Sequence, residues 1–519
     1  MNKKVRKRRL KYGGVSVLLS VLVISAVVIL NVIVGALAMR YEWMYRDMSV
    51  SAVYSISDNC REYLEDFVIS RVNDVNLTRP ESERQKIKLI FCDEQKNIEQ
   101  NNSWKHVYDS IYEVVEMFPN HIETEYLNIW ENPSVARTYG VSSVYDVVCI
   151  FGDRHETMNV ADFYVYGGDD ASTPTAYNGE KIIASCLMRI TQDRTPMCYF
   201  TANHGEDFSD YELIRAVVES GYTVGFLDLA TEDIPSDCEL LITFDPKQDF
   251  QISDSNSSVS EITKLEKYMS SGGRYMVFVS ADTFASGPRE NFESFLADWG
   301  VSYMHSAADD GVENCYTVRD LANSLTVDGY TVLSQKADKG TGAETVSDVT
   351  RPCAFGNSTC IAFSESFEDD GNGTLLCEVN GQKRTVSAVF TSHIGAVAWS
   401  GGRAVARADS EPFVLMSLSE QECENGDTAY LFASASTEMV KGDLMRSAAL
   451  GNNSAISEAI RAMGKKNTPS GLAMKQFEGD RIESLTTSLA NSITVALVVA
   501  PIVIVSVIGI VVLVRRKNS

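Results

Sequence analysis

The sequence of 519 residues lacks the short motifs that most often carry chemistry. It contains no G-x-x-x-x-G-K-S/T loop, which excludes a P-loop ATPase. It also contains no G-x-S-x-G nucleophile elbow, no H-E-x-x-H pair and no cysteine and histidine cluster with metal-ligand spacing. These absences predict a protein that has no catalytic residue set, no cofactor and no metal.

Cysteine motifs are absent as well. The chain has eleven cysteines, an odd number, and no C-x-x-C pair, so it does not read as a disulfide scaffold or a metal site. Several cysteines lie in apolar, strand-like runs, such as Cys92 in KLIFCD and Cys149 in VVCIF, where a buried free thiol is the usual state. Cys353 and Cys360 are close enough in sequence to form a disulfide, and spacing alone does not decide whether they do.

Basic residues are scarce in the middle of the chain and concentrated at its ends. The net charge is −24, yet residues 1–13 carry seven basic side chains and no acidic one, and residues 515–519 carry three more. The remainder therefore has a net charge of about −34. Such a surface is repelled by nucleic acid and by anionic lipid, so we expect no nucleic-acid partner.

Two long uncharged apolar runs, residues 14–39 and 493–514, are each long enough to span a bilayer. Because the basic clusters flank their outer ends, the positive-inside rule places both termini in the cytoplasm and the middle outside. The alternative for the first run is a cleaved signal peptide, with Ala36-Leu37-Ala38 as the cleavage site. Its length favours an uncleaved anchor. Residues 41–58 then bring aromatics suited to the membrane interface, and Ser57-Asp58 predicts a helix start.

Residues 40–180 are predicted to form a first unit outside the membrane. A buried strand at 86–93 and a helix at 104–118 are followed by a second strand, a short helix and a hairpin: 122–130, 131–141, 145–152 and 155–160. This β-α-β-α-β-β order resembles the thioredoxin fold. The redox C-x-x-C after the first strand is missing, because FCDEQK offers only Cys92, so no thiol exchange is expected.

Residues 181–305 are predicted to form a second unit, an α/β domain with a doubly wound parallel sheet, because strands and helices alternate there at short spacing. Its predicted strands include 196–201, 223–229, 238–246 and 274–282. Residues 306–430 change to short strand-like runs with Gly, Asn and Asp turns, which indicates a β-rich insertion. Residues 431–488 return to the α/β pattern and approach the membrane, which helix 489–514 crosses before the tail 515–519.

Polar residues follow three of the predicted parallel strands. Because ligands bind beyond the carboxyl ends of such strands, we interpret these residues as candidate ligand or partner contacts. They are His204, Glu206, Asp245, Ser280 and Asp282. We expect Glu206 and Asp282 to be exposed charges at one cleft. The alternative is that all five are ordinary polar groups that cap loops.

Taken in order, these pieces resemble the GldG-like auxiliary subunits of gliding-motility-type ABC transporters over nearly the whole chain. The stretches that carry the resemblance include YLNIWENPSVARTYGV, YFTANHGED, ESGYTVGFLDLATEDIPSDCELLITFDPKQDF and LEKYMSSGGRYMVFVSAD. The resemblance implies an extracytoplasmic domain beside an ABC-2-type permease and a separate cytoplasmic ATPase. The α/β unit is also similar to class I glutamine amidotransferase-like domains, but Ser280-Ala281-Asp282 stands where their nucleophilic cysteine is expected.

Two functions remain open from the sequence. The first is a non-catalytic membrane-anchored accessory subunit, attached to a permease by small residues in its helices, namely Gly35, Ala36, Ala38, Ser506 and Gly509. The alternative is a cell-surface hydrolase or amidotransferase-like enzyme that uses Ser280 with His204, which requires the base within hydrogen-bond reach of the nucleophile.

Overall fold

The computed structural model describes residues 53–477, except for 102–103, 167–172, 254–259, 286, 308–312 and 380. Nearly all of them belong to one compact unit, Ile56–Gly479. The two terminal apolar runs, with the five packing residues expected in them, lie outside the described residues. Within the described ranges, no helix combines the length and the apolar character needed to cross a bilayer.

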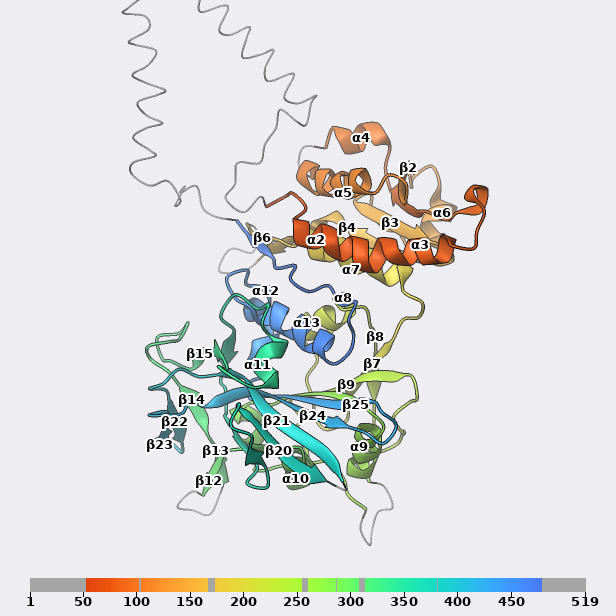
Figure 1. Cartoon of the computed structure of the whole chain (residues 1–519). Helices are drawn as coiled ribbons and strands as arrows, with labels where there is room; N and C mark the ends of the chain where they lie inside the picture. Colours follow the sequence, from red (N-terminus) through yellow and green to blue (C-terminus); the bar gives the residue numbers. More distant parts are fainter. Residues whose placement is uncertain are drawn as a thin grey trace, which may run out of the picture. The chain divides into compact units, whose positions relative to one another are not determined.

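The first sheet, which we call the small sheet, has four strands in the order β2-β1-β3-β4 (Figure 1). The strands are β1 (Ile87–Phe91), β2 (Ile122–Tyr126), β3 (Asp146–Phe151) and β4 (Arg154–Asn159). β1 runs parallel to β2 and antiparallel to β3, and β3 pairs with β4 as a hairpin. These are the strands predicted from the apolar runs of this stretch.

Helices cover one face of the small sheet more fully than the other. The face that carries Leu89, Phe91 and Cys149, all buried, packs against α5 (Lys105–Met117) and α7 (Gly179–Thr191). Among the described helices, the six-residue α6 (Pro133–Thr138) is the one that lies beside the opposite face. Before β1 lie α2 (Asp58–Tyr63), a π-helical turn Leu64–Ile69 and α3 (Ser70–Asn76), and α4 (Gln95–Glu99) follows β1. Ser57 caps α2 by accepting a hydrogen bond from the Cys60 amide, as its sequence predicts.

The second sheet, the large sheet, begins with five parallel strands in the order β8-β7-β9-β10-β25. They are β7 (Met197–Thr201), β8 (Thr223–Leu227), β9 (Cys238–Phe244), β10 (Arg274–Phe278) and β25 (Thr428–Ser434). Antiparallel strands then continue the same sheet: β24 (Val414–Glu422), β21 (Gln382–Thr391), β20 (Thr374–Val379) and β19 (Glu368–Asp369). The chain is thus of the α/β class, with parallel and antiparallel pairing in one sheet.

Both faces of the parallel part of the large sheet are covered. On one face, α8 (Glu212–Glu219) and α13 (Asn452–Ala462) contribute Leu213, Val217 and Ile456 to a buried core. On the other, α9 (Glu261–Ser270) and α10 (Glu290–Asp298) contribute Leu265 and Phe295. Continuous buried side chains on both faces explain why β9 reads as the apolar run CELLITF rather than as an alternating strand.

Short elements complete the fold. Three strands, β14 (Thr317–Arg319), β22 (Val397–Ser400) and β23 (Arg403–Arg407), form a side sheet, and β15 (Thr331–Leu333) pairs with β17 (Ala354–Gly356). The others are β11 (Val301–Tyr303), β12 (His305–Ala307), β13 (Glu313–Cys315), β16 (Gln335–Lys336), β18 (Ile361–Phe363), α11 (Thr341–Thr345) and α12 (Gly442–Arg446).

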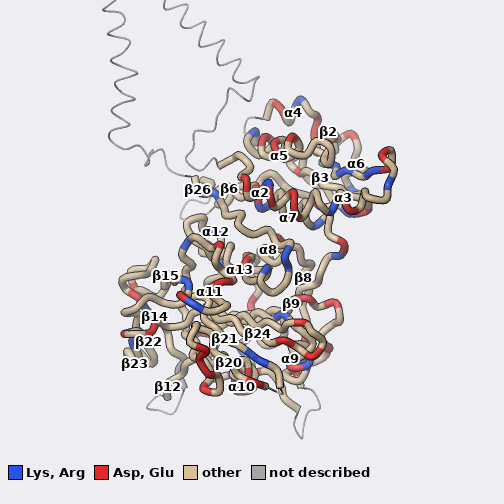
Figure 2. Tube along the Cα trace, viewed as in Figure 1, with Lys and Arg blue, Asp and Glu red and all other residues tan. Residues whose placement is uncertain are grey.

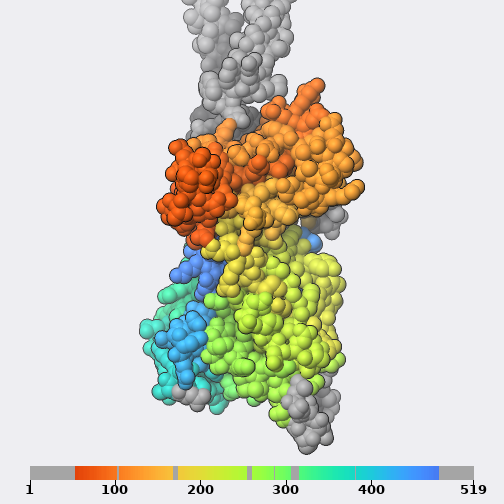
Figure 3. Space-filling model, turned by 90° about the vertical axis from the view of Figure 1, so that its right-hand side faces the viewer, coloured from red at the N-terminus to blue at the C-terminus, as the bar shows by residue number. Residues whose placement is uncertain are grey.

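Helix α7 connects the small sheet to the large one. It packs on β3 and β4 and also contacts α8, and α13 lies close by (Figures 1 and 3). From α7, the buried Lys181 ammonium donates to Ser457 Oγ at 2.9 Å and to Asn453 on α13, and it lies 3.4 Å from the Glu219 carboxylate on α8. Burial lowers the pKa of Lys181, and the charge of Glu219 partly offsets that effect. Lys181 therefore links helix α7, which packs on the small sheet, to α8 and α13, which pack on the large sheet.

The two ends of the described chain meet at the same place. β26 (Lys475–Gln476) pairs with β6 (Pro174–Tyr177), which pairs with β5 (Tyr164–Tyr166). Lys475 Nζ donates to Glu180 Oε1 at 2.8 Å, and Ser57 Oγ donates to the other oxygen of the same carboxylate at 3.2 Å. The buried Glu180 side chain therefore ties the first residues of the unit to the last, and we call this contact the Glu180 junction.

Candidate functional site

The five candidate residues lie at the carboxyl ends of β7, β9 and β10, as predicted. Because these strands are parallel neighbours, their ends meet at one edge of the large sheet. The edge is conformationally unusual: Asn203 (φ 81°), Asp245 (φ 53°) and Asn357 (φ 43°) are the non-glycine residues with positive φ in the described chain. Asn and Asp tolerate this left-handed conformation better than other side chains do.

His204 sits at the centre of a buried polar cluster. Its Nδ1 lies 3.1 Å from Glu206 Oε1, and its Nε2 lies 3.1 Å from Glu261 Oε1. The three side chains are only 5%, 1% and 2% exposed. The imidazole also stacks on the Phe250 ring, with centroids 4.0 Å apart. We call this arrangement the His204 cluster.

The two carboxylates decide the charge of the imidazole. Burial by itself lowers the pKa of His204, but the hydrogen bonds and charges of Glu206 and Glu261 outweigh it and raise the pKa to about 9. His204 is therefore protonated at neutral pH. The remaining carboxylate oxygens accept backbone hydrogen bonds, from the His204 amide to Glu206 at 2.7 Å and from the Gln251 amide to Glu261 at 2.7 Å. Both ring nitrogens of the protonated imidazole donate to carboxylates, so the ring has no lone pair available to act as a base.

Asp245 and Ser280 belong to a second, separate group. Asp245 Oδ1 accepts from Thr283 Oγ1 at 2.6 Å and from Lys247 Nζ at 2.7 Å. The Ser280 amide donates to the same Thr283 hydroxyl at 2.9 Å, and the Ser280 side chain is buried. Asp282 is exposed and accepts from Asn357 Nδ2. These contacts terminate β9 and β10 as loop caps.

Sequence reasoning was wrong about Glu206, which is a buried partner of His204 rather than an exposed contact charge. Within the described part of the chain, no hydrogen bond joins Ser280 to His204. Sequence reasoning also missed Glu261, which lies 57 residues after His204 and at the start of a helix. Its one signal is Ser260-Glu261, a helix cap followed by an acidic first turn, where the helix dipole favours a carboxylate.

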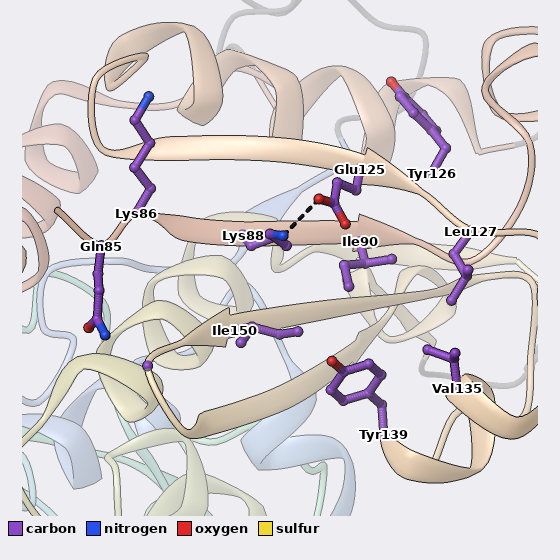
Figure 4. Close-up of a pocket in the computed structure, with 11 residues that line it drawn as sticks. Gln85, Lys86, Lys88, Ile90, Glu125, Tyr126, Leu127, Val135, Tyr139 and Ile150 are labelled. Atoms are coloured by element: carbon purple, nitrogen blue, oxygen red, sulfur yellow. Dashed lines mark hydrogen bonds and ion pairs between the residues drawn. The ribbon is translucent and has the colours of Figure 1, made fainter. Parts of the chain in front are cut away.

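A cavity of about 450 Å³ opens on the less covered face of the small sheet (Figure 4). Its polar wall includes Lys88, whose ammonium pairs with the Glu125 carboxylate at 2.7 Å. That bond raises the pKa of Lys88, and the opposing effect of burial is smaller. Ile90, Ile150 and Tyr139 form an apolar wall. This cavity leaves little trace in the sequence. Lys88 and Ile90 share one face of β1, and Leu89 and Phe91 are buried on the other.

The cysteines are all described, and all eleven are free thiols, including Cys353 and Cys360. Cys92, at the end of β1, is buried, and burial raises its pKa to about 12. A thiol with that pKa is not an attacking thiolate at neutral pH. Among the described residues, no group of three or more His, Cys, Asp and Glu side chains is arranged to hold a metal ion.

Neither a protein-family model nor a curated protein sequence matches the chain. Parts of it are similar to solved structures at low identity. An mmIFT52 N-terminal domain is 13% identical over 48% of this chain and 89% of its own, with a TM-score of 0.32. PurLQS from Thermotoga maritima is 11% identical over 52% of this chain and 98% of its own, with a TM-score of 0.25. The carbohydrate deacetylase Agd3 is 9% identical over 46% of this chain and 29% of its own, with a TM-score of 0.24. None of these similarities assigns the chain to a family.

Proposed function

We propose that the protein is a non-catalytic, membrane-anchored accessory subunit of an ABC transporter. In this proposal residues 14–39 and 489–514 are transmembrane helices, both termini are cytoplasmic, and the folded unit lies outside. Its partners are an ABC-2-type permease in the membrane and, through the permease, a cytoplasmic ATPase. The family proposed is the GldG-like auxiliary subunits.

The observation that carries the proposal is the Glu180 junction. A domain inserted between two membrane helices must bring its first and last residues to the side that faces the bilayer. Ser57 and Lys475 share the Glu180 carboxylate, so the chain enters and leaves the folded unit at one point. That arrangement suits two apolar runs that enter the same membrane side by side.

The proposal includes two finer assignments of fold, one for each sheet. The strand order β2-β1-β3-β4, with α5 and α7 on one face, supports a thioredoxin-like unit. The parallel strands β8-β7-β9-β10-β25, covered on both faces, support a unit similar to class I glutamine amidotransferase-like domains.

The hydrolase alternative has less support. A serine nucleophile needs a base that accepts its proton, and both His204 ring nitrogens already face carboxylates. Ser280 is buried against Thr283 instead. Ester or amide turnover by the purified full-length protein, abolished by Ser280→Ala, would nevertheless favour the enzyme.

The direct test is purification of the full-length chain from its own membranes in a mild detergent. We expect an ABC-2-type permease and its ATPase to copurify, and transport to be lost when the chain is deleted. If the chain purifies without a permease or ATPase, and transport survives its deletion, the proposal is wrong. Asp282→Lys provides a matched variant: as an exposed charge at the strand-end edge, it should weaken transport without unfolding the protein, if that edge contacts a partner or ligand.

Topology is tested separately with cysteines placed in the tails at Asn2 and Asn518. A membrane-impermeant thiol reagent applied to intact cells should not reach either tail, because both are proposed to be cytoplasmic. A cysteine at the exposed Val327 should react, since that side chain is fully exposed in the folded unit. Reaction of either tail would contradict the proposed topology.

A further inference from the structure

Four aromatic side chains form a continuous row on the small-sheet side of the unit. Tyr145 contacts Trp104, with ring centroids 5.6 Å apart, and Trp104 contacts Tyr164 at 5.7 Å. Tyr164 in turn stacks with Phe477 at 6.1 Å. We call these four side chains the aromatic row.

The row is accessible along its whole length. Tyr145 is 38% exposed, and Trp104, Tyr164 and Phe477 are half-buried. The four rings come from separate segments: the loop before β3, the cap of α5, strand β5 and the residue after β26. Aromatic rings gathered from distant segments normally close a core, but here none is fully covered. Three of them, Tyr145, Tyr164 and Trp104, carry a polar atom on an apolar ring, which suits a boundary between apolar and aqueous surroundings.

The row ends where the chain leaves the folded unit. Phe477 is the last described residue, and its amide donates to Thr175 in β6 at 3.0 Å. The Glu180 junction holds residue 57 at the same β6–β26 end. Residues 478–492 link Phe477 to the second apolar run in the sequence. Phe477 therefore places one end of the aromatic row within about 15 residues of the second apolar run along the chain.

We propose that the aromatic row lies in the headgroup layer of the membrane that the terminal helices enter, and that it sets the orientation of the folded unit on that membrane. Trp and Tyr concentrate at this level in membrane proteins, where ring and polar atom are both satisfied. The acidic protein gains nothing from anionic lipid, so the contact is made by rings rather than by charge. The inference rests on the proposed membrane anchoring.

The distribution of tryptophan allows a direct test, because the chain has only Trp43, Trp104, Trp130, Trp299 and Trp399. The full-length protein is reconstituted in phosphatidylcholine vesicles that carry a spin label on the lipid headgroup, as single-tryptophan variants with the other four changed to Phe. Trp43, beside the first apolar run, reports on anchoring. Trp104 reports on the row. Trp299 follows α10 and Trp399 lies in β22, both outside the small-sheet part of the chain, so they serve as controls for tryptophans away from the row.

We expect headgroup labels to quench Trp43 and Trp104 to a similar degree and to leave Trp299 and Trp399 unquenched. Quenching of Trp43 without Trp104 would overturn the aromatic contact and leave the anchor standing. Protein that fails to float with the vesicles, with Trp43 unquenched, would instead contradict the proposed function. Equal quenching of all four would overturn the proposed orientation.

Removing Trp299 also removes its ring contact with the Arg384 guanidinium, at 4.1 Å, so a variant that lacks it can fail to fold. A second measurement avoids multiple substitutions. The wild-type chain is labelled with 5-fluorotryptophan, and its ¹⁹F signals are assigned by single Trp→Phe changes. Broadening of the Trp104 signal by headgroup spin labels, with the Trp399 signal unchanged, is the expected result. An unbroadened Trp104 signal in anchored protein overturns the proposal.

Discussion

The small and large sheets differ in how their faces are covered. The large sheet has buried cores on both faces, and the His204 cluster at its strand ends is bonded inside the protein. The small sheet is fully covered on one face only, and it carries the 450 Å³ cavity, the aromatic row and the chain ends. Acidic and basic side chains are spread over both regions (Figure 2). The comparison indicates that the large sheet is closed on both faces of its parallel part, whereas the small sheet leaves one face partly open.

The strongest way to break this arrangement is to separate the two regions. Lys181→Ala removes the buried cation that binds Ser457 and Asn453, and it leaves the Glu219 carboxylate with only its longer contact to Arg215, at 3.7 Å. Losing one member of a buried ion pair costs about 3–5 kcal/mol. We expect urea unfolding of the full-length chain in detergent to split into two transitions. The surface variant Lys105→Ala, which breaks a pair with Asp109 within α5, should change the free energy of unfolding by at most about 0.5 kcal/mol.

A matched pair of core substitutions compares the two sheets directly. Leu241→Ala in β9 creates a void in a core that is closed on both sides, so it should cost about 2–5 kcal/mol. Ile150→Ala in β3 removes a half-buried side chain on the open face and should cost less than about 1.5 kcal/mol. Denaturant midpoints at constant slope give both values. Equal losses would show that the open face is closed in the native protein.

The His204 cluster makes the stability of the large region depend on pH. The folded pKa of about 9 lies above the unfolded value of 6.5, so the stabilisation is complete below about pH 6.5 and is lost as the pH rises through 9. Its size is at most about 3.5 kcal/mol, since each pKa unit corresponds to about 1.4 kcal/mol.

Thermal unfolding from pH 6 to 10 measures this effect. The slope in the alkaline range should be larger for the wild type than for His204→Gln, whose neutral amide cannot titrate. His155→Gln, on β4 of the small sheet, is the control and should retain the wild-type slope. A profile of His204→Gln that matches the wild type would show that the cluster does not carry the dependence.

The smallest effect is expected at the exposed end of the same strand edge. Asp282→Asn keeps a side chain that still meets Asn357, and it should alter the free energy of unfolding by less than about 0.5 kcal/mol. Glu206→Lys is the contrasting change, because it places a second cation beside the protonated His204 in a buried site. If Asp282→Asn and Glu206→Lys change the free energy of unfolding by the same amount, the division between the buried cluster and the exposed edge is wrong.

Local signals in the sequence predicted local structure well. Ser57 and Ser260 cap the helices that their spacing indicates. The stretch 369–373 forms the hairpin turn between β19 and β20, with Asp370 accepting from the Asn372 amide. In each case the determining contacts join residues only two or three positions apart.

Long-range pairing could not be predicted in the same way. The predicted β-rich stretch does not stand apart, because β21 and β24 pair antiparallel and extend the parallel sheet through β25. Nothing in a strand's own residues specifies a partner so distant in the sequence. The same limit explains Glu261: the charge of a neighbour across the fold, not the residue's own pattern, makes His204 a buried cation. The open face of the small sheet likewise depends on the shortness of α6 rather than on β1 or β3.

The Glu180 junction also has a mechanical consequence. Tension applied between the segments before Ser57 and after Lys475 is carried first by the bonds at one carboxylate and by the short β6–β26 pairing. The hundreds of residues in between form a closed loop outside the line of force. Movement of one end of the described chain relative to the other would therefore load α2 and β26 first and leave both sheets intact. A pull on the two chain ends therefore reaches the rest of the folded unit only after that junction opens.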